Sequence, residues 1–239
     1  MLQIFLKLRL LITKKFAVFV EGLTEQELTI RLLTELAGRH GITFEVHHQH
    51  LGRLALSELR SHETPILHVL IANCSNDEQV KSQIKDNYQS LKRAGYSLVI
   101  GLRDIYPFGH DDIAKLEAGL LVGLPCDDEL PIHIHLAVLE IEAWFLEEVN
   151  HFARIDNNIS MDDVIAGGFD HTQMGASELS HPAETLSKIC QSVGKGHSKN
   201  KRQVQRTIEA LDYEELYVNT CQKAASLKNF ISSLEAGLF

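Results

Sequence analysis

The chain has 239 residues, of which 44% are hydrophobic and 23% charged, the proportions of an ordinary soluble globular protein. No apolar run approaches the roughly 18 residues that a membrane helix needs, which argues against a membrane-spanning protein. The 23 basic and 32 acidic side chains give a formal net charge of −9, so the protein as a whole should repel nucleic acid. Any contact with nucleic acid must therefore come from a local basic patch.

The four cysteines stand far apart, without the spacing of a metal site and too few for a secreted disulfide scaffold. Reduced thiols in the cytoplasm are the simplest interpretation. The N-terminal stretch MLQIFLKLRLLITKK is apolar, but Lys7 and Arg9 interrupt it and no small-residue cleavage site follows. We interpret this stretch as an extra strand or an irregular extension, and we expect a cytoplasmic protein.

The first predicted unit is a strand followed directly by a helix. The apolar residues 16–20 (FAVFV) end at Glu21, and the apolar spacing over residues 28–36 predicts a helix. Thr24 and Glu27 have the spacing of a capping box at its start. The loop of such a unit lies at the carboxyl end of its strand, where open α/β sheets place their ligands.

Further strands and helices follow in alternation. The next predicted helix runs from a cap at Asp77 to Gly95, and another passes through residues 113–121. The remaining predicted strands, about four in number, cover 43–50, 66–72, 96–102 and a long run from 131 to the acids at 140 and 142. The first of these is polar and is expected at an edge of the sheet.

This order of elements predicts an α/β fold with a mostly parallel sheet flanked by helices. Residues 1–149 would form that core together with the N-terminal extension. Strand patterns cease after Asn150, so residues 150–239 are predicted to be a helical C-terminal appendage that packs on the core.

Three acids each end a predicted buried strand: Glu21, Asp104 and Glu142. Because the carboxyl ends of parallel strands meet at one crevice, we expect these carboxylates to lie close together. Their mutual repulsion requires a counter-charge, and hard oxygen ligands of this kind suit Mg²⁺ or Mn²⁺. A divalent ion held there would polarise a phosphodiester and activate water.

Glu25 lies four residues beyond Glu21, one helical turn away, from where its carboxylate can turn back toward the crevice. It is a candidate second ligand or catalytic base. The alternative is that Glu25 only favours the positive end of the helix dipole.

The segment FVEGLTEQE resembles the first motif of the Toprim fold, which topoisomerases, primases and OLD-type nucleases share, and its form VEGxTE is closest to the nucleases. In that family the motif's glutamate, a later DxD motif and a downstream acid bind Mg²⁺ and support phosphodiester chemistry. Here GLRDIYP supplies Asp104 as the first aspartate, with Tyr106 where the second would stand. Asp111 and Asp112 are the possible substitutes.

The third motif lies in LAVLEIEAWFLEE, which is similar to the E-x-W-hydrophobic-Leu motif of small stand-alone bacterial Toprim proteins. Glu142 is its acid, and Glu140 is a reserve candidate on the same predicted strand face. The resemblance covers roughly residues 16–148 and implies a Toprim-like, Rossmann-like core.

The segment GKGHSKNKRQVQR is the one dense basic cluster of this acidic sequence and the natural contact for a phosphate backbone. OLD-type nucleases carry a lysine beyond the acidic motifs that assists the transition state, so the resemblance makes Lys201 or Lys199 the candidate. The alternative is a solvated helix start.

Thirteen histidines include the run HHQH at 47–50, but alternation along a strand separates them and no further ligand completes a zinc site. His110, beside Asp111, is a further catalytic candidate. The sequence has no GxSxG, P-loop or GxGxxG motif, so serine hydrolases, NTPases and dinucleotide oxidoreductases lack their anchors.

The sequence therefore predicts a metal-dependent endonuclease in which Mg²⁺ or Mn²⁺ is held by Glu21, Asp104 and Glu142, with Glu25 and a C-terminal lysine assisting. Similar stand-alone Toprim proteins often accompany an ABC or SMC type ATPase in bacterial anti-phage systems, which implies a defence effector controlled by such a partner. DNA, RNA and tRNA remain open as substrates, as does a homodimer. The alternative is a non-catalytic Toprim module that binds a partner protein or nucleic acid. Nucleotidyl transfer, with Tyr106 as the residue to test, is a third possibility.

Overall fold

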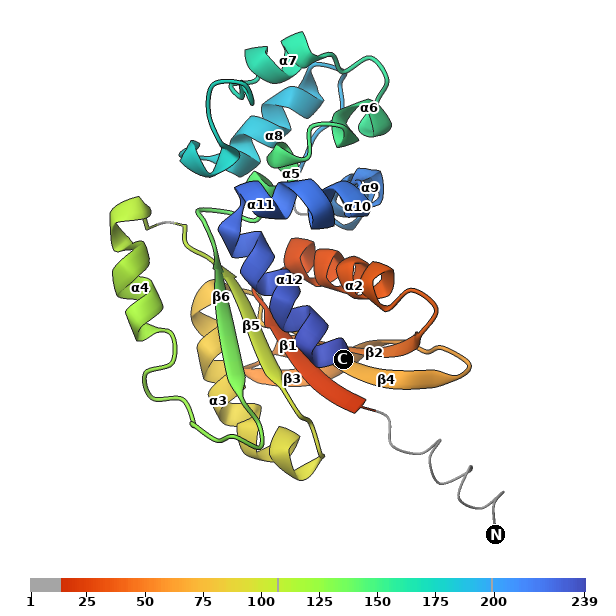
Figure 1. Cartoon of the computed structure of the whole chain (residues 1–239), viewed down its shortest axis with the longest axis vertical. Helices are drawn as coiled ribbons and strands as arrows, with labels where there is room; N and C mark the ends of the chain where they lie inside the picture. Colours follow the sequence, from red (N-terminus) through yellow and green to blue (C-terminus); the bar gives the residue numbers. More distant parts are fainter. Residues whose placement is uncertain (1–13, 107, 199) are drawn as a thin grey trace.

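A six-stranded sheet in the order β3-β2-β4-β1-β5-β6 forms the centre of the computed structural model, which describes residues 14–106, 108–198 and 200–239 (Figure 1). The strands are β1 (Lys14–Val20), β2 (Gly41–His50), β3 (Arg53–Arg60), β4 (Pro65–Asn73), β5 (Val99–Asp104) and β6 (Ile132–Ala137). All neighbouring strands are parallel except β2 and β3. The predicted α/β class with a mostly parallel, Rossmann-like sheet is confirmed.

Helices surround this sheet and make up most of the C-terminal part of the chain. The longer ones are α2 (Leu23–Ala37), α3 (Asp77–Arg93), α8 (Pro182–Gln191), α9 (Lys201–Ala210) and α12 (Ala225–Leu238). The shorter ones are α4 (Ile113–Gly119), α5 (Glu142–Glu147), α6 (His151–Ile155), α7 (Met161–Ala166), α10 (Tyr213–Glu215) and α11 (Cys221–Lys223). Within the described ranges, no helix has the length and apolarity required to cross a membrane.

Strand β1 is buried on both faces. Successive side chains of a strand point to opposite sides, so its residues divide between two hydrophobic clusters. Phe16, Val18 and Val20 join the larger hydrophobic cluster with α2 and α12, whereas Ala17 and Phe19 join the cluster with α3. Figure 1 shows α2 and α12 on one face of the sheet and α3 on the other. This two-sided burial explains why the strand reads as an unbroken apolar run.

The C-terminal helix α12 packs on the sheet beside α2, with contacts to β1, β5 and β6. Phe230 and Leu234 belong to the same hydrophobic cluster as Phe16. At Gly237 an added Cβ would lie 3.0 Å from the Phe16 ring, so the helix backbone approaches β1 as closely as a glycine allows. The helical character of this part of the chain agrees with the sequence, while the predicted boundary at residue 150 stays a prediction.

The position predicted for the polar strand was wrong. This strand is β2, and it lies inside the sheet between β3 and β4. The edge on this side of the sheet is β3, an antiparallel strand that the sequence analysis did not predict. Leu56 and Leu59 of β3 are largely exposed, so this strand lacks the alternation of a half-buried strand.

Two predicted helix starts differ from the structure. The N-cap of α2 is Gly22 in an extended conformation, without a side-chain cap, and Thr24 lies inside the helix, so no capping box forms there. Helix α3 is capped by Asn76, whose side chain accepts the N–H of Gln79.

The strand predicted to reach Glu142 is shorter than expected. Strand β6 ends at Ala137, Leu139 has a positive φ of 61°, and Glu142 is the first residue of α5. The backbone turns at Leu139, so Glu140 and Glu142 do not share a strand face. Residues 1–13 of the predicted N-terminal extension lie outside the described residues, and Lys14 and Lys15 begin β1.

Candidate active site

Glu21 and Asp104 meet at the carboxyl edge of the sheet. Asp104 is the last residue of β5, and Glu21 directly follows the neighbouring parallel strand β1. The backbone N–H of Asp104 donates a hydrogen bond to Glu21 Oε2 at 3.1 Å. The structure therefore brings these two predicted site residues together, as expected for the ends of adjacent parallel strands.

The third motif reaches the same place through its backbone. Asp104 Oδ1 accepts a hydrogen bond from the N–H of Ile141 at 3.1 Å, and both groups are buried. Ile141 directly precedes Glu142. Three segments that are far apart in the sequence are thus connected in a chain of hydrogen bonds from Glu21 through Asp104 to the start of α5.

The Glu142 side chain is 1% exposed, and both of its carboxylate oxygens lack a hydrogen-bond partner among the described residues. The Nε2 atom of the His197 imidazole lies 3.7 Å from Oε1. That distance is beyond a hydrogen bond. A carboxylate buried in this way is costly unless another group completes its surroundings.

His197 was missed by the sequence analysis, which considered the lysines and arginines of the basic segment but not its histidine. It lies in the loop between α8 and α9, is 9% exposed, and its Nδ1 lies 3.2 Å from Thr207 Oγ1. No sequence pattern singles it out, because its partner Glu142 lies 55 positions earlier in the sequence.

Glu25 lies buried in the first turn of α2, with its carboxylate turned back onto the turn that joins β1 to α2. A Cβ added at Gly22 would lie 3.1 Å from Glu25 Oε2. The glycine therefore leaves room for the carboxylate beside the end of β1. The predicted role of Glu25 in the crevice stays a prediction.

Two reserve candidates have other partners. Glu140 Oε2 accepts the N–H of Ala183 at 2.9 Å in the first turn of α8, where the helix dipole favours a carboxylate. Asp112 Oδ2 accepts the N–H of Gly109 at 3.4 Å in its own turn. Tyr106, which occupies the second position of the DxD motif, is 48% exposed and contacts the His181 ring edge-on at 6.0 Å between centroids.

The predicted basic cluster is divided among several partners. Lys195 Nζ donates to Ile155 O at 2.7 Å and pairs with Asp156 at 2.9 Å. The carboxyl of Glu58 on β3 has a lowered pKa, mainly because Arg60 donates to it and also because Lys201 is near. The structure thus places the candidate Lys201 beside β3, and Lys199 lies outside the described residues.

The other two cations of the cluster line a surface cavity. Arg202 and Arg206 of α9 and Arg154 of α6 surround a space of about 400 Å³ together with Glu209. Arg206 also donates to the carbonyl of Gly196 at 2.6 Å. Arg154 pairs with Asp212 at 2.6 Å, so the positive charge at this cavity comes mainly from Arg202 and Arg206.

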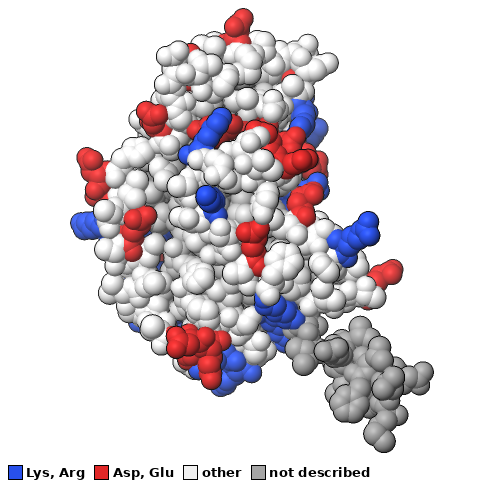
Figure 2. Space-filling model, viewed as in Figure 1, with Lys and Arg blue, Asp and Glu red and all other residues white. Residues whose placement is uncertain are grey.

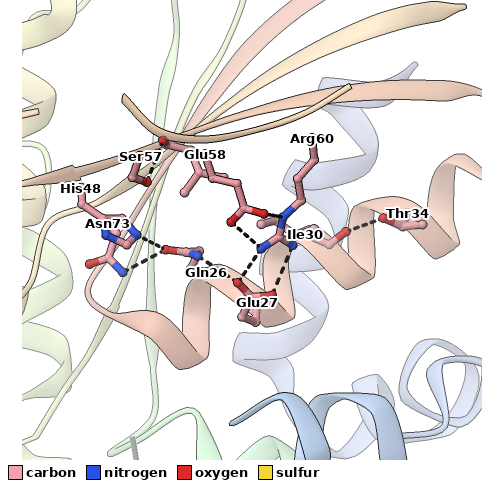
Figure 3. Close-up of polar contacts among 10 residues, drawn as sticks. Gln26, Glu27, Ile30, Thr34, His48, Ser57, Glu58, Arg60 and Asn73 are labelled. Carbon is pink, nitrogen blue, oxygen red and sulfur yellow. Dashed lines mark hydrogen bonds and ion pairs between the residues drawn. The ribbon is translucent and has the colours of Figure 1, made fainter. Parts of the chain in front are cut away.

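A second polar group along the carboxyl edge was also missed by the sequence analysis (Figure 3). Gln26 Oε1 accepts hydrogen bonds from His48 Nε2 at 2.9 Å and Asn73 Nδ2 at 3.0 Å. Its amide nitrogen donates to Glu27, which also receives two hydrogen bonds from Arg60. Asn73 ends an apolar strand in the same manner as Asp104, and that signal could have marked this edge.

Glu148 joins α5 to the C-terminal helices. Its carboxylate is buried and accepts the N–H groups of Asn150 at 3.0 Å and Asp212 at 3.1 Å. Burial raises the pKa of this carboxyl to about 7 despite these two donors. Desolvation likewise lowers the pKa of the fully buried His151 to about 4.

Within residues 14–106, 108–198 and 200–239, no three His, Cys, Asp or Glu side chains lie in an arrangement that could hold a metal ion as they stand. Comparisons with known protein families, curated proteins and solved structures gave no match. The function must therefore be argued from the residues at the carboxyl edge.

Proposed function

We propose that this protein is a metal-dependent endonuclease that hydrolyses phosphodiester bonds of nucleic acid at the carboxyl edge of a Toprim-like sheet. The observation that carries the proposal is the hydrogen-bonded chain from Glu21 through Asp104 to Ile141. It joins the three segments that resemble the Toprim motifs, in the order that the resemblance implies.

The residues fit a hard divalent cation in their chemistry. Glu21, Asp104 and Glu142 supply carboxylate oxygens, the ligands that Mg²⁺ and Mn²⁺ prefer. The oxygens of Glu142 are buried without hydrogen-bond partners among the described residues, so they are available as metal ligands. Since no three His, Cys, Asp or Glu side chains of the described residues are arranged to hold a metal ion, the proposal includes a rotamer change of at least one carboxylate on metal binding.

When bound, a divalent ion at these carboxylates would polarise the phosphodiester and lower the pKa of an attacking water. The chain's own residues supply the rest. The backbone N–H of Asp104 fixes the Glu21 carboxylate, and the N–H of Ile141 fixes that of Asp104, so both are oriented before substrate arrives. Glu25 lies beside the end of β1, where it can accept a proton from the attacking water.

Substrate capture would depend on a small part of the surface. Figure 2 shows a face on which Lys and Arg side chains are scattered among Asp and Glu. The cavity lined by Arg154, Arg202 and Arg206 is a local site for phosphate groups. A chain with a net charge of −9 would profit from a partner that delivers substrate, and the resemblance suggests an ABC or SMC type ATPase in a bacterial defence system.

The second candidate function is a non-catalytic Toprim module that binds a partner protein or nucleic acid. It is favoured by Tyr106, which stands in place of the second DxD acid and packs against His181. In that case the carboxyl edge would bind no metal, so metal affinity distinguishes the two functions.

The test is cleavage of plasmid, single-stranded DNA and total tRNA with Mg²⁺ or Mn²⁺ against EDTA, with and without the neighbouring ATPase if one exists. We expect metal-dependent products that disappear in Glu21→Ala, while Glu63→Ala, at an exposed loop position, cleaves normally. Products that persist in Glu21→Ala would contradict the site. Absence of both cleavage and Mn²⁺ binding would favour the binding module.

A further inference from the structure

We propose that the end of the β2–β3 hairpin binds backbone phosphates of the nucleic-acid substrate through His48, His50 and Arg53. The proposal rests on the proposed function in one respect, namely that the ligand is nucleic acid. It extends the candidate site along the carboxyl edge beyond β1, on the side away from β5.

The hairpin end lies in the same row of strand ends as the candidate active site. His48 pairs with Asn73 across β2 and β4, and Asn73 pairs with Val20 across β4 and β1. Neighbouring strands are about 4.8 Å apart, so the backbone of His48 lies about 10 Å from that of Val20, which directly precedes Glu21. Stacked nucleotides of one strand rise about 3.4 Å each, so this distance corresponds to about three nucleotides.

The three side chains that can carry positive charge share one face of the hairpin. His48 and His50 are two residues apart on β2, and Arg53 lies directly opposite His50 on β3. All three are exposed. His50 and Arg53 have no hydrogen bond or ion pair with the residues that the structure describes, and His48 has one hydrogen bond, through Nε2. Their charge is therefore available to an anion from solvent.

A chain of buried amides fixes the ring of His48 (Figure 3). Asn73 Oδ1 accepts the N–H of Ser75 at 3.1 Å, so Asn73 Nδ2 is the atom that donates to Gln26. Gln26 Oε1 is thus an acceptor, and Gln26 Nε2 donates to Glu27. His48 Nε2 lies 2.9 Å from that same oxygen and must therefore donate to it. In the neutral and in the charged ring alike, Nδ1 is the nitrogen that takes up and releases a proton.

An imidazole held in this way donates to phosphate only when it is charged. With a proton on Nδ1, the ring of His48 is a cation that can donate from Nδ1 to a phosphate oxygen, whereas without it the Nδ1 lone pair faces the anion. The affinity for phosphate should therefore fall as the pH rises between about 5 and 8, where histidines lose their charge. Arg53 is charged throughout this range and should hold phosphate at every pH.

Other charged groups surround His48 and set the strength of this contact. From α2, β2, β3 and α9 these groups are Glu27, His50, Arg53, Glu58, Arg60 and Lys201. Arg60 donates two hydrogen bonds to each of the two glutamates. The pKa of Glu58 is lowered, mainly by the hydrogen bonds from Arg60. His48 and Lys201 contribute to the same shift, so the hairpin end lies close to the basic start of α9.

The backbone of the hairpin end is held in place. Its turn consists of Leu51 and Gly52, both with positive φ, as a two-residue hairpin turn of this kind requires. The carbonyl of Gly52 accepts a hydrogen bond from Gln83 of α3 at 3.2 Å. The backbone that carries the three side chains therefore needs little ordering when substrate binds.

The experiment is fluorescence anisotropy of a labelled single-stranded DNA of about 12 nucleotides, with the full chain in a Glu21→Ala background that blocks the proposed cleavage. Arg53→Gln should weaken binding by about 10-fold. It should also lower the slope of log affinity against log salt concentration by about 0.7, the value for one lost phosphate contact. His48→Gln should weaken binding at about pH 5.5 and leave it unchanged at about pH 8.

Arg39→Gln and His47→Gln are the matched controls and should bind as the background protein does. Arg39 is an exposed arginine beyond the end of α2, and His47 lies on the opposite face of β2, paired with Glu45. Circular dichroism checks that each variant is folded. Unchanged affinity in both Arg53→Gln and His48→Gln would overturn the proposal. Displacement of the DNA by adenosine monophosphate at the same phosphate concentration would also overturn it, because the ligand would then be a free nucleotide.

The same substitution in the active protein separates this proposal from the proposed function. In cleavage assays Arg53→Gln should raise KM and leave kcat unchanged, because the contact holds substrate without touching the reacting atoms. Glu21-dependent cleavage with an unchanged KM in Arg53→Gln would contradict the hairpin site and still support the nuclease. Loss of DNA binding in Arg53→Gln without any cleavage by the wild type would support the hairpin site and contradict the nuclease.

Discussion

Glu27 and Glu142 are two buried glutamates that lie near the starts of helices at the same edge of the sheet, yet their surroundings differ. The Glu27 carboxylate is 7% exposed and receives two hydrogen bonds from Arg60, at 2.9 and 3.2 Å, and one from Gln26. Glu142 receives none from the described residues. Glu27, with its own guanidinium partner, is expected to serve the fold, whereas the lack of hydrogen bonds at Glu142 agrees with the proposed role in metal binding.

The largest effect on stability should come from Trp144, a neighbour of Glu142 in the hydrophobic core. Trp144 is 2% exposed, stacks on Phe230 with 6.0 Å between ring centroids, and donates to Ser226 at 3.0 Å. Trp144→Ala should cost about 3 to 5 kcal/mol in urea unfolding, since it leaves a large cavity. A loss below about 1 kcal/mol would show that α5 is not held by this contact.

The buried His151 should make the stability of the protein depend on pH. The pKa of His151 is about 4 in the fold, below its ordinary 6.5, because burial disfavours the charged ring. Its neutral form therefore contributes stability above pH 6.5 that is lost as the pH falls toward 4. The loss is on the order of 3 kcal/mol, at about 1.4 kcal/mol for each pH unit.

The measurement that checks this is urea unfolding of the wild type and His151→Gln at steps between pH 7 and pH 4.5. The variant removes the titrating ring, so its stability should decline less steeply over this range. Parallel curves for the two proteins would mean that His151 is not the group responsible.

Substitution of the two glutamates should separate their roles. Glu27→Ala leaves Arg60 without a bidentate partner and should cost about 2 kcal/mol. Glu142→Gln removes a buried charge that has no hydrogen bonds, so stability should stay the same or rise by about 1 kcal/mol. Chemical denaturation of both variants provides the test, and a loss above 2 kcal/mol in Glu142→Gln would make it a structural residue.

The smallest effect should come from an exposed glutamate on the same helix as Glu27. Glu35 pairs with Arg31 at 2.6 Å one turn away, with both side chains nearly half exposed. Glu35→Ala should change the free energy of unfolding by at most about 0.5 kcal/mol, because exposed pairs are solvated and screened. A cost equal to that of Glu27→Ala would show that burial does not explain the difference.

The sequence predicted those parts of the fold in which burial of the side chains alone determines the apolar pattern. Strand β1, buried on both faces, was found because its unbroken apolar run ends at a glycine turn and a helical pattern follows. Strand β3 was missed because its exposed leucines follow neither the two-residue period of a half-buried strand nor the 3.6-residue period of an amphipathic helix. Glu21 and Asp104 were found by the rule that parallel strands end at one crevice, and the structure places them in contact.

The remainder of the site depends on tertiary contacts that no local pattern records. The turn at Leu139 moves Glu142 from a strand onto a helix, where its carboxylate meets His197. Arg60 and Glu27 are 33 positions apart, and their pairing follows from the unpredicted strand β3. Long-range partners of this kind are fixed by packing, which the periodicity of either segment cannot show.

The central claim is that the carboxylates of the β1 and β5 ends act on phosphodiesters, whereas those with salt-bridge partners serve the fold. The direct measurement is Mn²⁺-dependent cleavage by Asp104→Asn and Glu27→Gln, assayed beside the wild type at a temperature where all three are folded. We predict that Asp104→Asn loses cleavage and that Glu27→Gln retains it. Equal activity in the two variants, or loss in Glu27→Gln alone, would contradict the account.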